Sequence, residues 1–130
     1  MTAPHIRIGQ LGEQTVCNHL KRKGYVICAT NYRKKWGEID IVAQKEDTIH
    51  FIEVKTVSRR TLPDSVTHET WLPEENVQAH KLRKLFRTIE TWLSEHQYDG
   101  EWCLDVASVW IDPVHRRGRV KILENVTGES

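Results

Sequence analysis

Residues 37–57 read GEIDIVAQKEDTIHFIEVKTV, and their pattern predicts the centre of a β-sheet. Its two halves are rich in β-branched residues and are separated by the charged pair Glu46 and Asp47. Two such runs joined by a short polar turn are typical of a β-hairpin. A two-residue turn pairs Lys45 with Thr48 and thereby predicts the register of the whole hairpin.

The predicted register gathers charged side chains on one face of the hairpin. Asp40 lies opposite Glu53, and Glu38 lies opposite Lys55. Because side chains alternate along a strand, all four project from the same face. The other face is predicted to hold the apolar residues Ile39, Ile41, Ile52 and Val54.

The facing acids Asp40 and Glu53 predict a cation site. Directly opposed side chains have Cβ atoms only about 4.5–5.5 Å apart, and two carboxylates at that separation repel. A hard divalent cation such as Mg²⁺ suits two carboxylates plus waters, and Lys55 adds a further positive charge. The residues alone leave open a polar, solvent-exposed face on which Lys55 bridges Glu38 or Glu53.

The segments around the hairpin predict one α/β domain. Apolar and small residues recur every four positions from Ile8 to Lys23, which predicts an amphipathic helix ended by Gly24. A second helix is predicted to begin at Pro73, since proline and acidic residues suit a first helical turn. The other expected elements are strands at 25–30, 37–44, 48–57, 102–111 and 119–126 and a long loop at 58–72. The predicted order is α-β-β-β-α-β-β in a single domain of residues 1–130, with its core at about 8–126.

A third acid, Glu13, lies at the margin of the apolar stripe of the first predicted helix. A carboxylate is costly to bury there unless it meets a cation or hydrogen-bond donors. Glu13 pointing towards the sheet fits a metal site together with the hairpin acids. The alternative is a boundary residue that reaches water or pairs with an arginine.

Composition places the chain among ordinary globular proteins. It has 130 residues, 38% hydrophobic and 28% charged, with a net charge of +1. No run approaches the ~20 apolar residues of a membrane span, and the first residues do not resemble a signal peptide. We therefore expect a cytoplasmic protein that does not engage a membrane. Its basic clusters either track a phosphate backbone or form solvated faces.

The cysteines and histidines give no metal signal at the level of sequence. Cys17, Cys28 and Cys103 are odd in number and widely spaced, so they are predicted to be small core residues rather than disulfide or zinc ligands. The 7 histidines are scattered, and a lone strand residue such as His50 is expected to be packed rather than liganding.

The chain also resembles a known family through a series of motifs in a fixed order. Asp40 followed by Glu53-Val54-Lys55 resembles the Asp…Glu-x-Lys signature of restriction-endonuclease-like nucleases. The whole series, over about residues 9–126, resembles the bacterial YraN-like family of proposed endonucleases. Its motifs are Gly9-Gln10-Leu11-Gly12-Glu13, Gly24-Tyr25, Asn31-Tyr32-Arg33, Gly37-Glu38-Ile39-Asp40, Phe51-Ile52-Glu53-Val54-Lys55-Thr56, Pro73-Glu74-Glu75 with Val77 and Lys81, and Leu104-Asp105-Val106.

This resemblance implies a restriction-endonuclease-like fold, a mixed central sheet with flanking helices, and a kinship to archaeal Holliday-junction resolvases. It implies a metal-dependent endonuclease acting on DNA, including branched DNA. The expected Mg²⁺ or Mn²⁺ ligands are Glu13, Asp40, Glu53 and the Val54 carbonyl. The expected catalytic residues are Asp40, Glu53 and Lys55, with Arg33 and Lys81 binding nucleic acid and Glu38 as an accessory acid.

Two other functional classes fit the sequence. A nucleic-acid-binding module that does not cut would act with a larger DNA-processing assembly. An interaction protein would use its tryptophans, Trp71, Trp92, Trp102 and Trp110, as contact residues. The sequence leaves open DNA or RNA as the partner, and a monomer or a homodimer.

Overall fold

The computed structural model describes residues 4–58, 79–112, 114 and 117–126. Its elements follow the predicted α-β-β-β-α-β-β order and confirm the α/β class. They are α1 (Pro4–Arg22), β1 (Val26–Lys34), β2 (Gly37–Lys45), β3 (Thr48–Ser58), α3 (Ala79–Glu95), β4 (Glu101–Asp112) and β5 (Arg117–Leu123). Pro73, the predicted start of the second helix, and the predicted loop after Ser58 lie outside the described residues.

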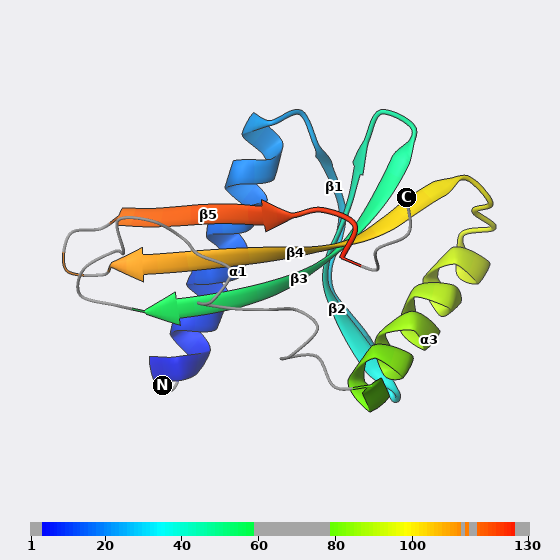
Figure 1. The fold of residues 1–130 in the computed structure, drawn as a ribbon, viewed down its shortest axis with the longest axis horizontal. Helices are drawn as coiled ribbons and strands as arrows, with labels where there is room; N and C mark the ends of the chain where they lie inside the picture. Colours follow the sequence, from blue (N-terminus) through cyan, green and yellow to red (C-terminus); the bar gives the residue numbers. More distant parts are fainter. Residues whose placement is uncertain (1–3, 59–78, 113, 115–116, 127–130) are drawn as a thin grey trace.

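The five strands form one mixed sheet in the order β1-β2-β3-β4-β5 (Figure 1). Neighbouring strands are antiparallel except β3 and β4, which pair in parallel. Parallel neighbours need a long crossover connection, and the chain between β3 and β4 contains α3. The sheet is therefore mixed, as the sequence predicted.

The β2–β3 hairpin has the predicted register over its paired part. Lys45 pairs with Thr48 across a two-residue turn, and the pairing runs to Ile41 opposite Ile52. Beyond that pair, β2 and β3 run apart towards different edges of the molecule (Figure 1). The divergence opens a split in the sheet next to Asp40.

The split also corrects the predicted apolar face of the hairpin. Ile41, Ile52 and Val54 belong to one core cluster, whereas Ile39 packs with Val42 in another. Ile39 and Ile41, which would share one face of a regular hairpin, therefore contribute to different clusters. A regular two-residue period could not anticipate a change of face within a strand.

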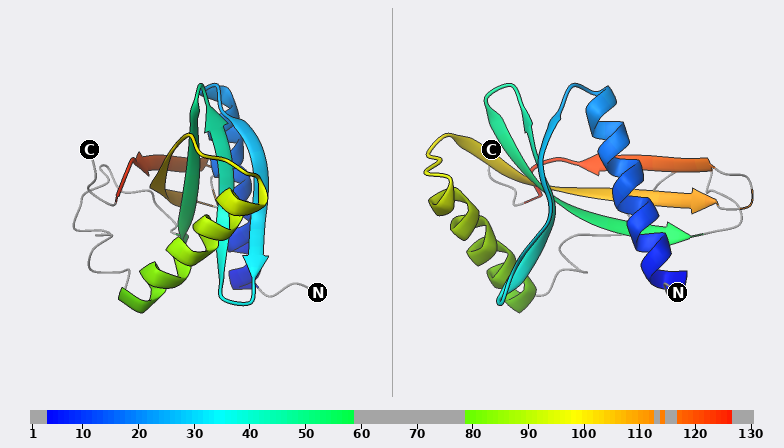
Figure 2. Two further views of the ribbon diagram at one scale, coloured as in Figure 1. Left: turned by 90° about the vertical axis from the view of Figure 1, so that its right-hand side faces the viewer. Right: turned by 180° about the vertical axis from the view of Figure 1, so that it is seen from behind.

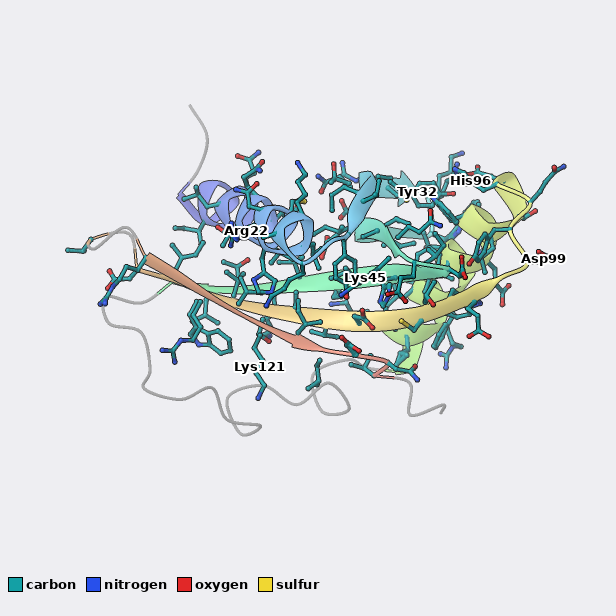
Figure 3. The ribbon with its side chains drawn as sticks, turned by 90° about the horizontal axis from the view of Figure 1, so that it is seen from above. Arg22, Tyr32, Lys45, His96, Asp99 and Lys121 are labelled. Carbon is teal, nitrogen blue, oxygen red and sulfur yellow. The ribbon has the colours of Figure 1, made fainter. Side chains whose placement is uncertain are left out.

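Helices α1 and α3 cover separate parts of the sheet, as the views in Figure 2 show. One core cluster combines α1 with β2, β3 and β4, including Val16, Leu20 and Val109. The other combines α3 with β2, β3 and β4. Seen from above, α1 lies along one face of the sheet, and Lys121 of β5 points away from it (Figure 3).

Two glycines allow the helices to approach the strands closely. A Cβ atom on Gly12 of α1 would lie 2.0 Å from Thr56 Oγ1 of β3. A Cβ atom on Gly37 of β2 would lie 2.4 Å from Thr88 Oγ1 and 3.1 Å from the Lys84 carbonyl oxygen of α3. The two contacts with threonine oxygens are far below a normal contact distance, so each glycine sets the spacing between a helix and the sheet.

Several element boundaries and one burial prediction differ from the sequence expectation. β1 extends to Lys34, four residues beyond the predicted end at Thr30, and β5 ends at Leu123, before the predicted end at Val126. Cys17 is buried, as predicted, and Cys103 partly so, but Cys28 is exposed. Cys28 lies between Ile27 and Ala29, where a bulge shifts the β1–β2 register, and this irregularity accompanies its exposure.

The aromatic residues of the described chain contribute mainly to the core. Trp92 and Trp110 are buried, and Trp102 is 36% exposed.

Neither helix of the described ranges combines the length and the apolar character needed to cross a membrane.

Candidate functional site

Asp40 lies at the point where β2 and β3 separate. Its Oδ2 atom accepts a hydrogen bond of 2.8 Å from the backbone N–H of Val54. A regular ladder would pair backbone with backbone here, but the separation leaves the N–H of β3 to a side chain of β2. The hydrogen bond fixes this carboxylate between the two strands.

Glu53 precedes Val54 on β3 and contributes the second carboxylate. Its Oε1 atom lies 3.7 Å from Lys81 Nζ, near the start of the described part of α3. The Glu53 side chain is 22% exposed, and that of Lys81 is 56% exposed. This ion pair joins α3 to β3 and places Lys81 beside the acids, while its predicted contact with nucleic acid stays a prediction.

Glu13 and Glu38 approach the same region from α1 and from the start of β2. Glu13 receives a side-chain hydrogen bond from Asn31, and it interacts electrostatically with Glu38 and Arg33. Arg33 Nη2 lies 2.8 Å from Glu38 Oε2, which ties the ends of β1 and β2 together. The helix residue Glu13 is thus turned towards the strands, and its interaction with Arg33 also fits the alternative of an arginine partner.

Burial and neighbouring acids raise the pKa values of Asp40 and Glu53. Burial raises the pKa of Asp40 to about 7, and the neighbouring charge of Glu53 adds to the effect, while the Val54 hydrogen bond opposes it. Burial also raises the pKa of Glu53, which Lys81 counteracts, and Glu38 and Glu13 raise it further. Four carboxylates that repel one another in one place store electrostatic energy that a cation would release.

The acids line a pocket of about 270 Å³. One side consists of strand residues and the other of α3, which contributes the apolar Leu85. Its described lining residues are Gly37, Glu38, Asp40, Glu53, Lys81, Lys84 and Leu85. The pocket therefore combines acids on the sheet with lysines on the helix.

Lys55 and Val54 occupy different positions relative to this pocket. Val54 packs against the α1 cluster, and its N–H binds Asp40. Lys55 follows on β3, two residues after Glu53 and therefore on the same side of the strand, but it is not among the residues that line the pocket. The predicted roles of the Val54 carbonyl and of Lys55 stay predictions, as does the binding of nucleic acid by Arg33.

Sequence reasoning missed two residues of the site. Lys84 lines the pocket together with Lys81, and the signal was their spacing, because residues three apart share a helix face. Asn31 donates to Glu13 from a left-handed backbone conformation with φ of 52°. Asparagine is among the few residues that tolerate this conformation, but the sequence could not show that its side chain meets α1.

The chemistry of these donors suits a hard divalent cation. Carboxylate oxygens are the ligands that Mg²⁺ and Mn²⁺ prefer. Without a cation the pKa values of Asp40 and Glu53 are raised, so their ionised forms are disfavoured. Within the described residues, no three of the four carboxylates bring their oxygens as close together as the ligands of one ion. A cation here would therefore keep several water ligands, as Mg²⁺ usually does.

The fold and the pocket define an α/β protein whose mixed sheet divides around a group of acids, with lysines facing them from a helix. The sequence matches the family described as "Uncharacterised protein family UPF0102" over residues 12–109. The chain belongs to this family, and the resemblance to the YraN-like family is confirmed.

Named relatives cover nearly the whole chain. A UPF0102 protein of Moorella thermoacetica is 36% identical over 125 residues, which is 95% of this chain and 98% of the relative. UPF0102 proteins of Helicobacter pylori strain HPAG1 and Campylobacter lari are each 32% identical, over 95% and 92% of this chain and 93% and 92% of their own lengths. Their names give the family and state no activity.

Proposed function

We propose that this protein is a divalent-metal-dependent endonuclease that hydrolyses phosphodiester bonds in DNA. The observation that carries the proposal is the grouping of Asp40, Glu53 and Glu38 in one pocket, opposite Lys81 and Lys84. Acids that hold a cation and lysines that hold a phosphate are the two components that phosphodiester hydrolysis requires.

Asp40 and Glu53 would hold the cation, with Glu13 and Glu38 binding directly or through water. Bound there, Mg²⁺ or Mn²⁺ would supply a Lewis acid for a phosphodiester oxygen and lower the pKa of a bound water. The Val54 N–H orients the Asp40 carboxylate before any ligand arrives. This hydrogen bond leaves the other Asp40 oxygen available as a ligand.

The lysines of α3 would bind the phosphate. In the present arrangement Lys81 lies beside Glu53, where it partly neutralises that acid. A cation would take over this neutralising role, so that the Lys81 ammonium group becomes free to contact substrate. Lys84 lies on the same helix face and would place a second positive charge along the phosphate backbone.

Lys55 would act at the reacting phosphate. An ammonium group close to the scissile bond either orients the attacking water or stabilises the charge that develops on the phosphate oxygens. Its position on β3 beyond Glu53 places it on the same side of the strand as that acid.

The deciding experiment is cleavage of an end-labelled panel of single-stranded, duplex, flap and four-way-junction DNA, together with matched RNA. The natural protein is compared with the variants Asp40→Asn, Glu53→Gln and Lys55→Ala in Mg²⁺ and in Mn²⁺. Glu90→Gln is the matched control, because Glu90 is an exposed acid of α3 outside the pocket.

Metal-dependent cutting by the natural protein and the control, but by none of the three site variants, would support the proposal. The substrate that is cut fastest identifies the preferred shape and distinguishes DNA from RNA. Binding without cutting of any substrate, at equal affinity in all five proteins, would reject the nuclease in favour of a binding module.

A further inference from the structure

A second group of metal-ligand side chains lies away from the acidic pocket, on β3 and β4. His50 and Cys103 are paired residues of these parallel strands, and Asp105 follows two positions later, on the same side of β4. Their ligand atoms all lie within 4.8 Å of one another. His50 is separated from Cys103 by 53 residues and from Asp105 by 55, so the spacing gave no metal signature.

The three side chains are in direct contact. His50 Nδ1 lies 2.6 Å from Asp105 Oδ2 and 3.2 Å from Cys103 Sγ. The Cys103 thiol donates a hydrogen bond of 3.3 Å to Asp105 Oδ1. The thiol, one imidazole nitrogen and the two carboxylate oxygens therefore form one contiguous group.

We propose that His50, Cys103 and Asp105 form a binding site for a transition-metal ion, with Zn²⁺ as the best match. Thiolate, imidazole and carboxylate are the three ligand types that proteins use for Zn²⁺, and three protein ligands leave a fourth position for water. A thiolate ligand disfavours Mg²⁺, so this site and the acidic pocket select different metals.

The distances between the donor atoms suit this ion. Tetrahedral zinc with ordinary bond lengths requires its donor atoms to be about 3.4–3.6 Å apart. The two contacts of Cys103 Sγ, at 3.2 and 3.3 Å, are close to that requirement. Asp105 contacts Cys103 through Oδ1 and His50 through Oδ2, so its carboxylate must turn to present one oxygen to the ion. The 2.6 Å separation of Oδ2 from His50 Nδ1 must also widen by roughly 0.8 Å.

Neighbouring groups hold the ligands in position. The backbone N–H of Asn125 donates to Asp105 Oδ1 at 2.9 Å, and the Tyr25 ring packs edge-on against His50 with centroids 5.1 Å apart. Partners of this kind orient metal ligands in known sites. The His50 side chain is 11% exposed and Cys103 is partly exposed, which gives an ion a route of entry.

The chemistry of Cys103 argues against a nucleophilic role. Burial, together with the charge of Asp105, raises the pKa of the Cys103 thiol to about 12, so the metal-free thiol stays protonated. When the ion binds, the thiol proton leaves to solvent and sulfur becomes the ligand. Binding thus releases the thiol proton.

The test is titration of the full-length protein with Co²⁺, which reports thiolate coordination through a charge-transfer band in the near ultraviolet. We expect a band that saturates at one Co²⁺ per chain and disappears when Zn²⁺ is added. Cys103→Ser should abolish the band, whereas Cys28→Ser should retain it, because Cys28 is exposed on β1. Asp40→Asn should also retain the band, which separates this site from the acidic pocket.

A second measurement does not depend on the colour of cobalt. Zn²⁺ should raise the melting temperature of the natural protein and of Asp40→Asn, and Cys103→Ser should bind Zn²⁺ at least about 10-fold more weakly. Absence of the band in the natural protein, or its persistence in Cys103→Ser, would overturn the proposal. His50 and Asp105 would then form only a buried polar pair.

Discussion

Asp40 Oδ2 accepts a hydrogen bond from the backbone N–H of Val54 just beyond the last paired residues of β2 and β3. The contact places a carboxylate between two diverging strands, where it is buried and faces Glu53. Burial and a like charge both disfavour the ionised form of Asp40. Folding without a cation therefore costs free energy at neutral pH.

The first prediction concerns stability without metal. The pKa of Asp40 rises from the ordinary value of 3.8 to about 7 in the folded protein. The contribution of Asp40 to the free energy of unfolding is therefore fully present below pH 4 and is lost as the pH rises to 7. Asp40→Asn, which stays neutral and can still accept from Val54, should be more stable than the natural protein by roughly 2–4 kcal/mol at pH 8. The two should differ little at pH 4.

Urea denaturation at both pH values, in the presence of a chelator, measures this difference. Asp99→Asn is the matched control, since Asp99 is exposed after α3, and it should leave stability nearly unchanged. Added Mg²⁺ should stabilise the natural protein and not Asp40→Asn. Equal stability of Asp40→Asn and the natural protein at pH 8 would show that the ionised Asp40 carboxylate does not lower the free energy of unfolding.

A second prediction concerns the glycines of α1. Gly12→Ala should destabilise the protein by roughly 1–3 kcal/mol, because the new Cβ atom would collide with Thr56. Gly9→Ala in the same helix should stabilise it by about 0.5–1 kcal/mol, since nothing lies within 4 Å of its Cβ position and alanine favours helices.

Thermal unfolding of the two variants measures these opposite effects. Adding Thr56→Ala to Gly12→Ala should restore part of the lost stability, because it removes the atoms that collide. Similar melting temperatures for Gly9→Ala and Gly12→Ala would show that α1 does not pack closely on β3.

The third prediction tests the lysines of the pocket. Lys81→Ala should weaken DNA binding and lower the slope of log affinity against log salt by about 1, because one phosphate contact is lost. Fluorescence anisotropy at several salt concentrations, with Ca²⁺ to prevent cutting, measures both quantities. Arg83→Ala removes an exposed cation from α3 outside the pocket, and it should leave the slope closer to that of the natural protein.

The sequence predicted much of the hairpin because local chemistry determines it. The Glu46–Asp47 turn and the β-branched runs specify the register from Lys45 opposite Thr48 to Ile41 opposite Ile52. The separation of β2 and β3 beyond Ile41 and Ile52 was missed because it depends on the whole sheet rather than on local chemistry. Ile39 therefore packs with Val42 rather than with Ile41.

The same difference between local and whole-sheet determinants explains why one group of ligands was predicted and the other was not. Asp40 and Glu53 were found because the strands that carry them form a hairpin, so their numbers alone predict that they approach. His50 and Cys103 meet across parallel strands whose connection contains α3, and no local rule relates their positions. Cys28 was placed in the core because a bulge has no reliable signature in a sequence without a glycine.

The last prediction ranks the acids of the pocket by their share in metal binding. Glu13 belongs to α1, accepts a hydrogen bond from Asn31 and acts on Asp40 mainly through its charge. Glu13→Gln should therefore weaken Mn²⁺ binding by about 10-fold, the effect of losing an indirect ligand. Asp40→Asn and Glu53→Gln should each weaken it considerably more, because direct ligands are lost. Calorimetric titration with Mn²⁺ in the Cys103→Ser background confines the measurement to the acidic pocket. If Glu13→Gln lost as much affinity as Asp40→Asn, Glu13 would be a direct ligand, and α1 would have to move towards the split between β2 and β3 when metal binds.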